Sequence, residues 1–322
     1  MAVYTKLTFD EIQNHLQNYD LGKLLEFKEI LAGIDNSNFI IFTQKGKFIL
    51  TIFESRIDKN YLPFFINFKL HLAKSGILCP CPMLNHQGLA IVDIKEKKSA
   101  IVSFLNGKTL DPRSDGYYDN ITAKHCGEVG EVLAKLHLAA INFNLFREND
   151  LGEKGFRKFF LKFENLVDGY QKGLQEEILQ AINFVEQNWK NGLPSASAHL
   201  DLFPDNVFFD EKNKISGIID FYFAANDLLI YDFAIVVNAW CFDEKNNFAE
   251  EKFLVLKNSY EKIRKFSSQE NNFLKIALIA AALRFLLTRL HDMFFTPKNS
   301  HVIVKNPQEY LVKLRYFVND KT

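Results

Sequence analysis

The sequence predicts an α+β fold in two lobes, and three observations support this prediction. Short β-rich runs separated by turn residues fill most of residues 1–105. Apolar residues at helical spacing dominate residues 106–322. A polar loop at residues 199–207, followed by a strand–turn–strand pattern, interrupts these helices. Because no internal repeat or low-complexity linker is present, we expect two contiguous lobes, 1–105 and 106–322.

The first lobe is predicted to begin with a helix and to contain five strands and a second helix. Thr8 and Glu11 form a capping-box pattern before the first helix. Pro63 suits the start of the second helix, and Gly76 ends its apolar pattern. The strands are expected at residues 24–31, 38–43, 47–54, 88–95 and 99–105.

The second lobe is predicted to be mainly helical. Val129, Leu133, Leu136 and Ala140 lie on one helical face, which predicts a helix from residue 121 onward. Further helices are expected at residues 156–170, 174–189, 228–242, 249–266, 269–293 and 307–318.

One polar loop in this lobe carries the residue types of a phosphoryl-transfer site. Asn206 follows Asp201 by five positions, and Asp220 ends an apolar run fourteen residues later. Such a site needs a carboxylate to orient the attacking hydroxyl and oxygen ligands for Mg²⁺. Pro204 favours a rigid loop over a helical turn. A hairpin over residues 207–219 can bring Asn206 beside Asp220.

The motif carries a family resemblance. His199-x-Asp201-x-x-x-x-Asn206-Val207, followed by Ile219-Asp220-Phe221, resembles the aminoglycoside phosphotransferase and choline kinase group of small-molecule kinases. The longer phrases at residues 199–209, 219–224, 226–234 and 238–242 are similar to the homoserine kinases of that group, over about a seventh of the chain. The resemblance implies a bilobal protein kinase-like fold, with an antiparallel N-terminal sheet and a helical C-terminal lobe.

The resemblance also implies cofactors and roles. ATP and Mg²⁺ would be the cofactors and L-homoserine the small-molecule substrate, in a step toward threonine. Asp201 would be the catalytic base, and Asn206 and Asp220 the metal ligands. His199 and Asp232 would support the catalytic loop structurally.

The nucleotide is expected in the first lobe. The segment after the first strand stands where kinases place a glycine-rich loop, although it contains a single Gly and, taken alone, its pattern favours a plain hairpin turn. The segment that joins the lobes would be the hinge whose backbone binds adenine. The expected nucleotide-binding residues are Gly33, Asn36, Ser37, Asn38, Ser103 and Leu105.

One departure from the kinase pattern leaves two interpretations open. Thr51 stands where protein kinases have a phosphate-gripping Lys, and residues 60–75 contain no acidic partner for one. The chain is either an active enzyme that holds phosphate by other groups or an inactive kinase fold used as a binding module. The intact base and metal ligands favour an active enzyme.

The substrate site is expected from residues that follow Asp220. A zwitterion such as homoserine needs one acidic and one basic contact near its reacting hydroxyl. Choline or ethanolamine, an aminoglycoside and methylthioribose are the alternative substrates. The candidate substrate residues are Tyr222, Asp227, Asn238, Trp240 and Arg284. Asp227 could receive the ammonium, and Arg284 and Arg289 are the candidates for the carboxylate.

Composition narrows the class of partner. Lys+Arg and Asp+Glu both number 39, which argues against extended nucleic-acid or membrane contact. The first ten residues contain no apolar signal run, so we expect a cytoplasmic protein. The four scattered cysteines fit neither a disulfide framework nor a zinc ribbon. Nothing in the sequence determines the oligomeric state.

Overall fold

A computed structural model describes the chain except at six short segments, residues 1–3, 32–35, 55–57, 113–117, 298–303 and 320–322. The chain divides into two compact units. The first unit contains residues 1–106 and also the short segment 217–222. The second unit contains residues 107–216 and 223–322.

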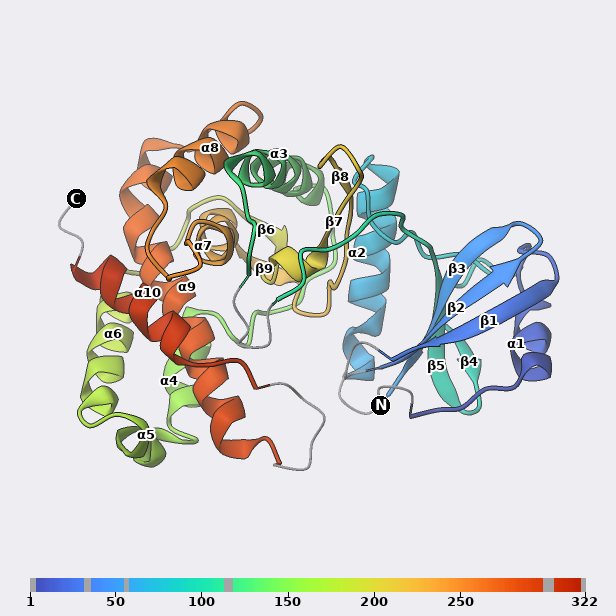
Figure 1. Cartoon of the computed structure of the whole chain (residues 1–322), viewed down its shortest axis with the longest axis horizontal. Coiled ribbons are helices and arrows are strands. Elements are labelled where there is room, and N and C mark those ends of the chain that lie inside the picture. The colour runs from blue at the N-terminus through green and yellow to red at the C-terminus, as the bar shows by residue number, and fades with distance from the viewer. Residues whose placement is uncertain (1–3, 32–35, 55–57, 113–117, 298–303, 320–322) are drawn as a thin grey trace. The chain divides into compact units, whose positions relative to one another are not determined.

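A five-stranded antiparallel sheet is the framework of the first unit (Figure 1). Its strand order is β1-β2-β3-β5-β4. Between β2 and β3 the chain turns at Gly46, whose φ of 137° suits a glycine. The strands are β1 (Leu24–Ile30), β2 (Asn36–Thr43), β3 (Gly46–Phe53), β4 (Val92–Ile94) and β5 (Lys97–Ser103).

Two helices complete the hydrophobic clusters of this unit. Helix α1 (Phe9–Leu16) begins with the predicted capping box at Thr8 and packs with sheet residues such as Phe39 and Leu50. Helix α2 (Leu62–Lys74) follows a 3₁₀ turn, Lys59–Tyr61, and joins a second cluster with the end of β3. The predicted fold class of this lobe is therefore confirmed.

The second unit is built around two buried helices. Every residue of α7 (Leu229–Trp240) is buried, and α9 (Ser268–Phe295) packs against it. The other helices are α3 (Ala123–Ala140), α4 (Glu153–Phe160), α5 (Glu164–Tyr170), α6 (Leu174–Asn188), α8 (Glu250–Glu261) and α10 (Gln308–Asn319).

The single helix predicted at residues 156–170 is divided into two helices, α4 and α5. The chain leaves the helical conformation at Phe163, between α4 and α5, where φ is −146°. Phe163 is buried and its ring lies 5.6 Å from that of Phe160 and 5.8 Å from that of His291. Packing of this ring accounts for the break, which apolar periodicity alone does not reveal.

Four short strands occur in the second half of the chain. β6 (Ser195–Ala198) pairs antiparallel with β9 (Ala225–Leu228), and β7 (Val207–Phe209) pairs with β8 (Ile215–Ile218). The β7–β8 hairpin is predicted by the sequence, but β6 and β9 are not, because their small residues carry little strand signal.

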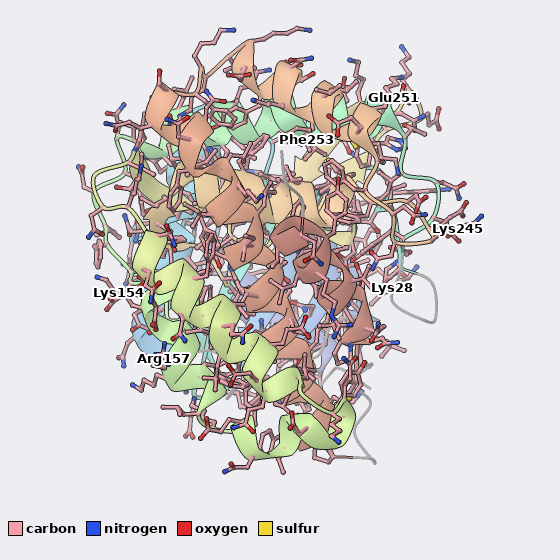
Figure 2. All side chains as sticks on the ribbon, turned by 90° about the vertical axis from the view of Figure 1, so that its left-hand side faces the viewer. Lys28, Lys154, Arg157, Lys245, Glu251 and Phe253 are labelled. Carbon is pink, nitrogen blue, oxygen red and sulfur yellow. The ribbon has the colours of Figure 1, made fainter. Side chains whose placement is uncertain are left out.

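Charged residues of both signs cover the outside of the second unit. Lys154 and Glu251 are exposed, and Arg157 forms an ion pair of 2.5 Å with Glu186 (Figure 2). Among the described helices, none is both long and apolar enough to cross a membrane.

Candidate active site

The loop that follows β6 holds a strained residue at its centre. Leu200 has a φ of 60°, which is uncommon for a residue with a side chain. This conformation directs two successive N–H groups at one carboxylate: His199 N donates to Asp232 Oδ2 over 3.0 Å, and Leu200 N donates to Asp232 Oδ1 over 2.8 Å. Asp232, on α7, therefore holds the backbone immediately before Asp201.

Asp232 is fully buried and ionised. Burial raises the pKa of its carboxyl, but the hydrogen bond from His137 and the Leu200 N–H outweigh burial and leave the pKa below its ordinary value. An ionised carboxylate accepts hydrogen bonds more strongly than a neutral one. The loop is thus fixed by charge-assisted hydrogen bonds rather than by packing alone.

A series of buried side chains continues behind Asp232. His137 Nε2 lies 3.0 Å from Asp232 Oδ2, and His137 Nδ1 lies 2.7 Å from the Tyr260 hydroxyl. Arg264 donates to the Tyr260 hydroxyl over 3.0 Å and to Glu270 over 2.7 Å. Burial lowers the pKa of His137, which favours the neutral ring. Neutral His137 then donates from Nε2 to Asp232 and accepts from Tyr260 at Nδ1.

Asp201 and Asn206 are joined directly. Asn206 Nδ2 donates to the Asp201 carbonyl over 2.7 Å and lies 3.4 Å from Asp201 Oδ2. Asn206 ends a single 3₁₀ turn, Pro204–Asn206, so the prediction of a rigid loop without a helical turn is wrong for these three residues. Proline fits the first position of such a turn because the N–H that it lacks has no partner there. Since these bonds use the amide nitrogen, the Asn206 oxygen is the atom left to ligate a cation.

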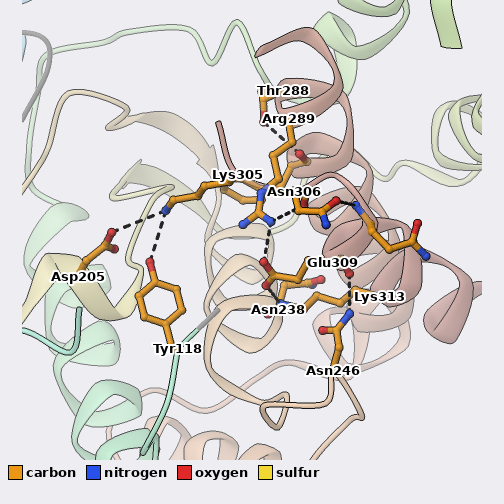
Figure 3. A network of polar contacts seen from close by, with 12 residues as sticks. Tyr118, Asp205, Asn238, Asn246, Thr288, Arg289, Lys305, Asn306, Glu309 and Lys313 are labelled. Atoms are coloured by element: carbon orange, nitrogen blue, oxygen red, sulfur yellow. Dashed lines mark hydrogen bonds and ion pairs between the residues drawn. The ribbon is translucent and has the colours of Figure 1, made fainter. Parts of the chain in front are cut away.

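Two further contacts fix this loop from the side. Trp240 donates its indole N–H to the Leu202 carbonyl over 2.8 Å, so its only polar donor is committed to the loop. The Asp205 carboxylate forms an ion pair with Lys305, with 3.7 Å between Oδ2 and Nζ, and Lys305 also lies beside Tyr118 (Figure 3). These contacts assign Trp240 and Asp205 to holding the loop.

In the first unit, Asp220 follows β8 by two residues and has a φ of 64°. Asp tolerates this left-handed conformation better than most residues. Phe221 and Tyr222 anchor it in the core of the unit: the Phe221 ring lies 5.9 Å from that of Phe68, and the Tyr222 ring lies 5.7 Å from that of Phe65. Along the chain, Asn206 and Asp220 flank the β7–β8 hairpin.

A buried lysine that the sequence analysis missed lies close to this segment. Lys69 Nζ, on α2, is 5.7 Å from the centroid of the Tyr222 ring. Burial lowers the pKa of Lys69 to about 8, although the charges of Cys79 and Asp220 oppose this change. It stands in a helix whose other inward residues are apolar, so periodicity alone does not distinguish it from a surface lysine.

The expected phosphate turn differs from the prediction. Asn36, Ser37 and Asn38 belong to strand β2, paired with Phe53, Ile52 and Thr51, whereas Gly33 lies outside the described residues. The strand extends this far because Ser37 Oγ accepts the N–H groups of Tyr4 and Thr5 and donates to Glu54.

Asn38 and the hinge residues also have defined contacts. Thr51 Oγ1 donates to Asn38 Oδ1 over 2.8 Å. Ser103, the last residue of β5, exchanges hydrogen bonds of 2.9 Å with the Cys81 backbone through both its N–H and its hydroxyl. Leu105 packs against Gly217, where a Cβ atom would clash with its side chain.

The remaining substrate candidates differ in how many hydrogen bonds their side chains already form within the protein. Asp227 accepts from Asn149 Nδ2 over 2.6 Å and from the Leu228 N–H over 2.7 Å, and burial raises its pKa. Asn238 Nδ2 donates to the Ala234 and Leu278 carbonyls, which ties α7 to α9. Arg284 is almost fully buried on α9 beside Tyr231, and its Nε and Nη1 atoms have no hydrogen-bond partner among the described residues.

The chain is similar to known proteins over most of its length. Residues 26–266 match the phosphotransferase enzyme family. The chain is 42% identical to a homoserine kinase of Agrobacterium fabrum (strain C58) over 98% of its length and 95% of that protein. It is 43% identical to a homoserine kinase of Bradyrhizobium diazoefficiens, over 98% of this chain and 94% of the other.

Solved structures with the same fold are much more distant in sequence. An amicoumacin kinase shares 14% identity at a TM-score of 0.68, covering 95% of this chain and 90% of that one. Spectinomycin phosphotransferase APH(9)-Ia shares 13% identity at a TM-score of 0.66, covering 99% and 96%. The predicted kinase-like fold is confirmed by these similarities, and the chain belongs to the phosphotransferase enzyme family.

Proposed function

We propose that this protein transfers the γ-phosphate of ATP to the hydroxyl of L-homoserine and forms O-phospho-L-homoserine, a step toward threonine. The observation that carries the proposal is the 42% identity to a curated homoserine kinase over nearly the whole chain. The intact Asp201–Asn206 pair supports an active enzyme over a binding module.

Asp201 is proposed as the base. Its backbone is held on one side by Asp232, through the two residues before it, and on the other by Asn206. A carboxylate in this position accepts a hydrogen bond from the substrate hydroxyl, orients it toward the γ-phosphorus and takes the proton late in the transfer. Such pre-organisation matters because small errors in the position of reacting groups cost much of the rate.

Asn206 and Asp220 are proposed to supply oxygen ligands for Mg²⁺. Amide and carboxylate oxygens are the donors that this ion prefers, and Mg²⁺ sites of kinases take their other ligands from phosphates and water. When bound, the ion neutralises charge that develops on the phosphate oxygens. The unused oxygen of the Asn206 amide fits this role.

The nucleotide is proposed to bind through Ser103 and Leu105, whose backbone would contact adenine, and through the segment from Gly33 to Asn38. Within that segment, Ser37 serves the sheet, so its backbone rather than its hydroxyl would face the nucleotide. Tyr222 and Asp227 remain proposed substrate contacts, with Asp227 receiving the ammonium. We place the enzyme in the cytoplasm, without nucleic-acid or membrane partners, which its balanced charge supports.

Detection of the product tests the proposal. Purified protein with Mg·ATP and L-homoserine should yield the phosphomonoester of homoserine, followed by ³¹P NMR. Asp201→Asn should remain folded and bind ATP while kcat falls by roughly 10² to 10⁴. Nucleotide binding without phosphoryl transfer in the unmodified protein would support the inactive binding module instead.

A further inference from the structure

Arg284 is a buried cation without a counter-ion. Its side chain is only 2% exposed, yet its Nε and Nη1 atoms have no hydrogen-bond partner in the described part of the chain. No described carboxylate lies within ion-pair distance of it. A buried charge without a partner costs several kcal/mol, so natural proteins seldom keep one without a reason.

The surroundings of Arg284 are aromatic rather than acidic. Its guanidinium carbon lies 4.9 Å from the centroid of the Phe285 ring and 5.7 Å from that of Phe223. Asp227, whose pKa is lowered by the charge of Arg284, already accepts hydrogen bonds from Asn149 and the Leu228 N–H. The aromatic faces favour a cation here but do not neutralise it.

Arg289, on the same helix, has the counter-ion that Arg284 lacks, although its Nη2 atom also has no hydrogen-bond partner among the described residues. It is also buried, but its Nη1 donates to Glu309 over 2.6 Å and to the Asn306 carbonyl over 2.9 Å (Figure 3). Glu309 in turn pairs with Lys313 over 2.5 Å. The protein therefore neutralises Arg289 internally, whereas Arg284 has no carboxylate partner among the described residues.

Arg284 is connected to the catalytic loop through packed rings. The Phe285 ring lies 4.9 Å from that of Phe203, whose backbone N–H donates to the Asp201 carbonyl over 2.8 Å. The Phe285 ring also lies 5.1 Å from that of Tyr310 on α10. All of these residues belong to the second unit.

Tyr310 offers a second unused donor in the same place. It is fully buried, and its hydroxyl has no hydrogen-bond partner among the described residues. Burial, followed by the charges of Glu309 and Asp201, raises the pKa of Tyr310, while the charges of Arg289 and Arg284 lower it. Its hydroxyl is therefore protonated, a donor within electrostatic range of both Asp201 and Arg284.

We propose that Arg284 and Tyr310 form the subsite that binds the carboxylate of the substrate. The inference rests on the proposed function, because homoserine carries a carboxylate near the hydroxyl that reacts. Guanidinium and phenol donors to a carboxylate give charge-assisted hydrogen bonds. A site built around them leaves a buried cation unpaired when the alcohol has no carboxylate, and so disfavours choline, ethanolamine and aminoglycosides.

The test compares L-homoserine with 3-aminopropan-1-ol, which is homoserine with hydrogen in place of the carboxylate. The unmodified enzyme should strongly prefer homoserine. Arg284→Gln should lower kcat/KM for homoserine by about 10²-fold or more, mainly through KM, with a much smaller change for 3-aminopropan-1-ol. Tyr310→Phe, which removes only an unpaired hydroxyl, should reduce the same preference by about tenfold.

Arg289→Gln is the matched control. It breaks a buried ion pair and removes a guanidinium that lies 4.5 Å from the Tyr310 ring, so it should lower the thermal midpoint, whereas Arg284→Gln should not. A preference for homoserine that survives both Arg284→Gln and Tyr310→Phe would overturn the subsite while leaving the kinase in place. Absence of homoserine phosphorylation in the unmodified enzyme would instead overturn the proposed function.

Discussion

Lys69 is a single residue whose burial lowers the stability of the folded protein. It lies in an apolar helix and is buried, without an ion pair to any described carboxylate. Burial lowers its pKa from 10.5 to about 8. Below pH 8 both the folded and the unfolded chain are protonated at Lys69, so the full cost of burying the charge is present at pH 7.

Lys69→Met should therefore stabilise the protein. The expected gain in the free energy of unfolding at pH 7 is up to about 3 kcal/mol, and the rise in stability of the unmodified protein between pH 8 and 10.5 should disappear. Urea unfolding at pH 7 and pH 10 measures both effects. Lower stability of the variant at pH 7 would show that the ammonium makes a stabilising contact.

Thr51 stands where protein kinases have their phosphate-gripping lysine, and in this structure its hydroxyl donates to Asn38. A neutral hydroxyl cannot supply the charge of a lysine, so Thr51→Ala should keep kcat/KM within several-fold. Steady-state kinetics with varied ATP checks this expectation. A thousandfold loss with the fold intact would give Thr51 a catalytic part.

The spacing within the loop motif selects Asp201 and Asn206 as candidates, and the family resemblance adds Asp232. The same spacing says nothing about Lys69 or Tyr310. The apolar pattern of α10 assigns Tyr310 to the core. The pattern of α2 assigns Lys69 to a surface position with its ammonium in solvent. Burial identifies Lys69, and burial together with a hydroxyl that has no hydrogen-bond partner among the described residues identifies Tyr310.

At the scale of elements, α7 positions the catalytic loop through charge. Asp232 holds the loop, and His137 on α3 and Tyr260 on α8 stand behind it. His137 has a pKa below 6.5 because it is buried, so below that pH the unfolded chain takes up a proton that the folded chain refuses. Stability should therefore fall as the pH drops below 6.5.

His137→Gln should reduce this dependence by about one proton. It should also lower overall stability, because the replacement cannot reproduce both ring hydrogen bonds. Urea unfolding between pH 7 and 5 gives the slope, to which His15 and His125 also contribute because burial lowers their pKa values. His86→Gln, at an exposed position, is the control. An unchanged slope in His137→Gln would mean that His137 is already charged in the folded protein.

Helices and strands with a strong local sequence pattern are predicted correctly. Elements that depend on contacts between residues far apart in the chain are not. The helices with long apolar faces and the N-terminal strands follow from sequence, as do the capping box at Thr8 and the β7–β8 hairpin. The extension of β2 through Ser37 depends on hydrogen bonds to Thr5 and Glu54, which no local pattern encodes. The pairing of β6 with β9 likewise depends on residues far apart in the chain.

At the scale of the whole molecule, the division into compact units does not follow the order of the chain. Asn206 lies in the second unit and Asp220 in the first, in the segment 217–222 that the expected boundary at residue 105 does not anticipate. Asp220→Ala should abolish Mg²⁺-dependent turnover and weaken Mg·ATP binding, because a carboxylate ligand is lost. Titration of activity and nucleotide binding with Mg²⁺ measures this, and wild-type curves would remove Asp220 from the metal site.

The central claim is that the chain is a kinase whose acceptor is homoserine. The most direct measurement is kcat/KM for L-homoserine, choline, methylthioribose and an aminoglycoside, assayed in parallel with the same enzyme and Mg·ATP. We expect a kcat/KM for L-homoserine that exceeds those of the other alcohols by orders of magnitude. A value for homoserine no higher than the others would contradict it.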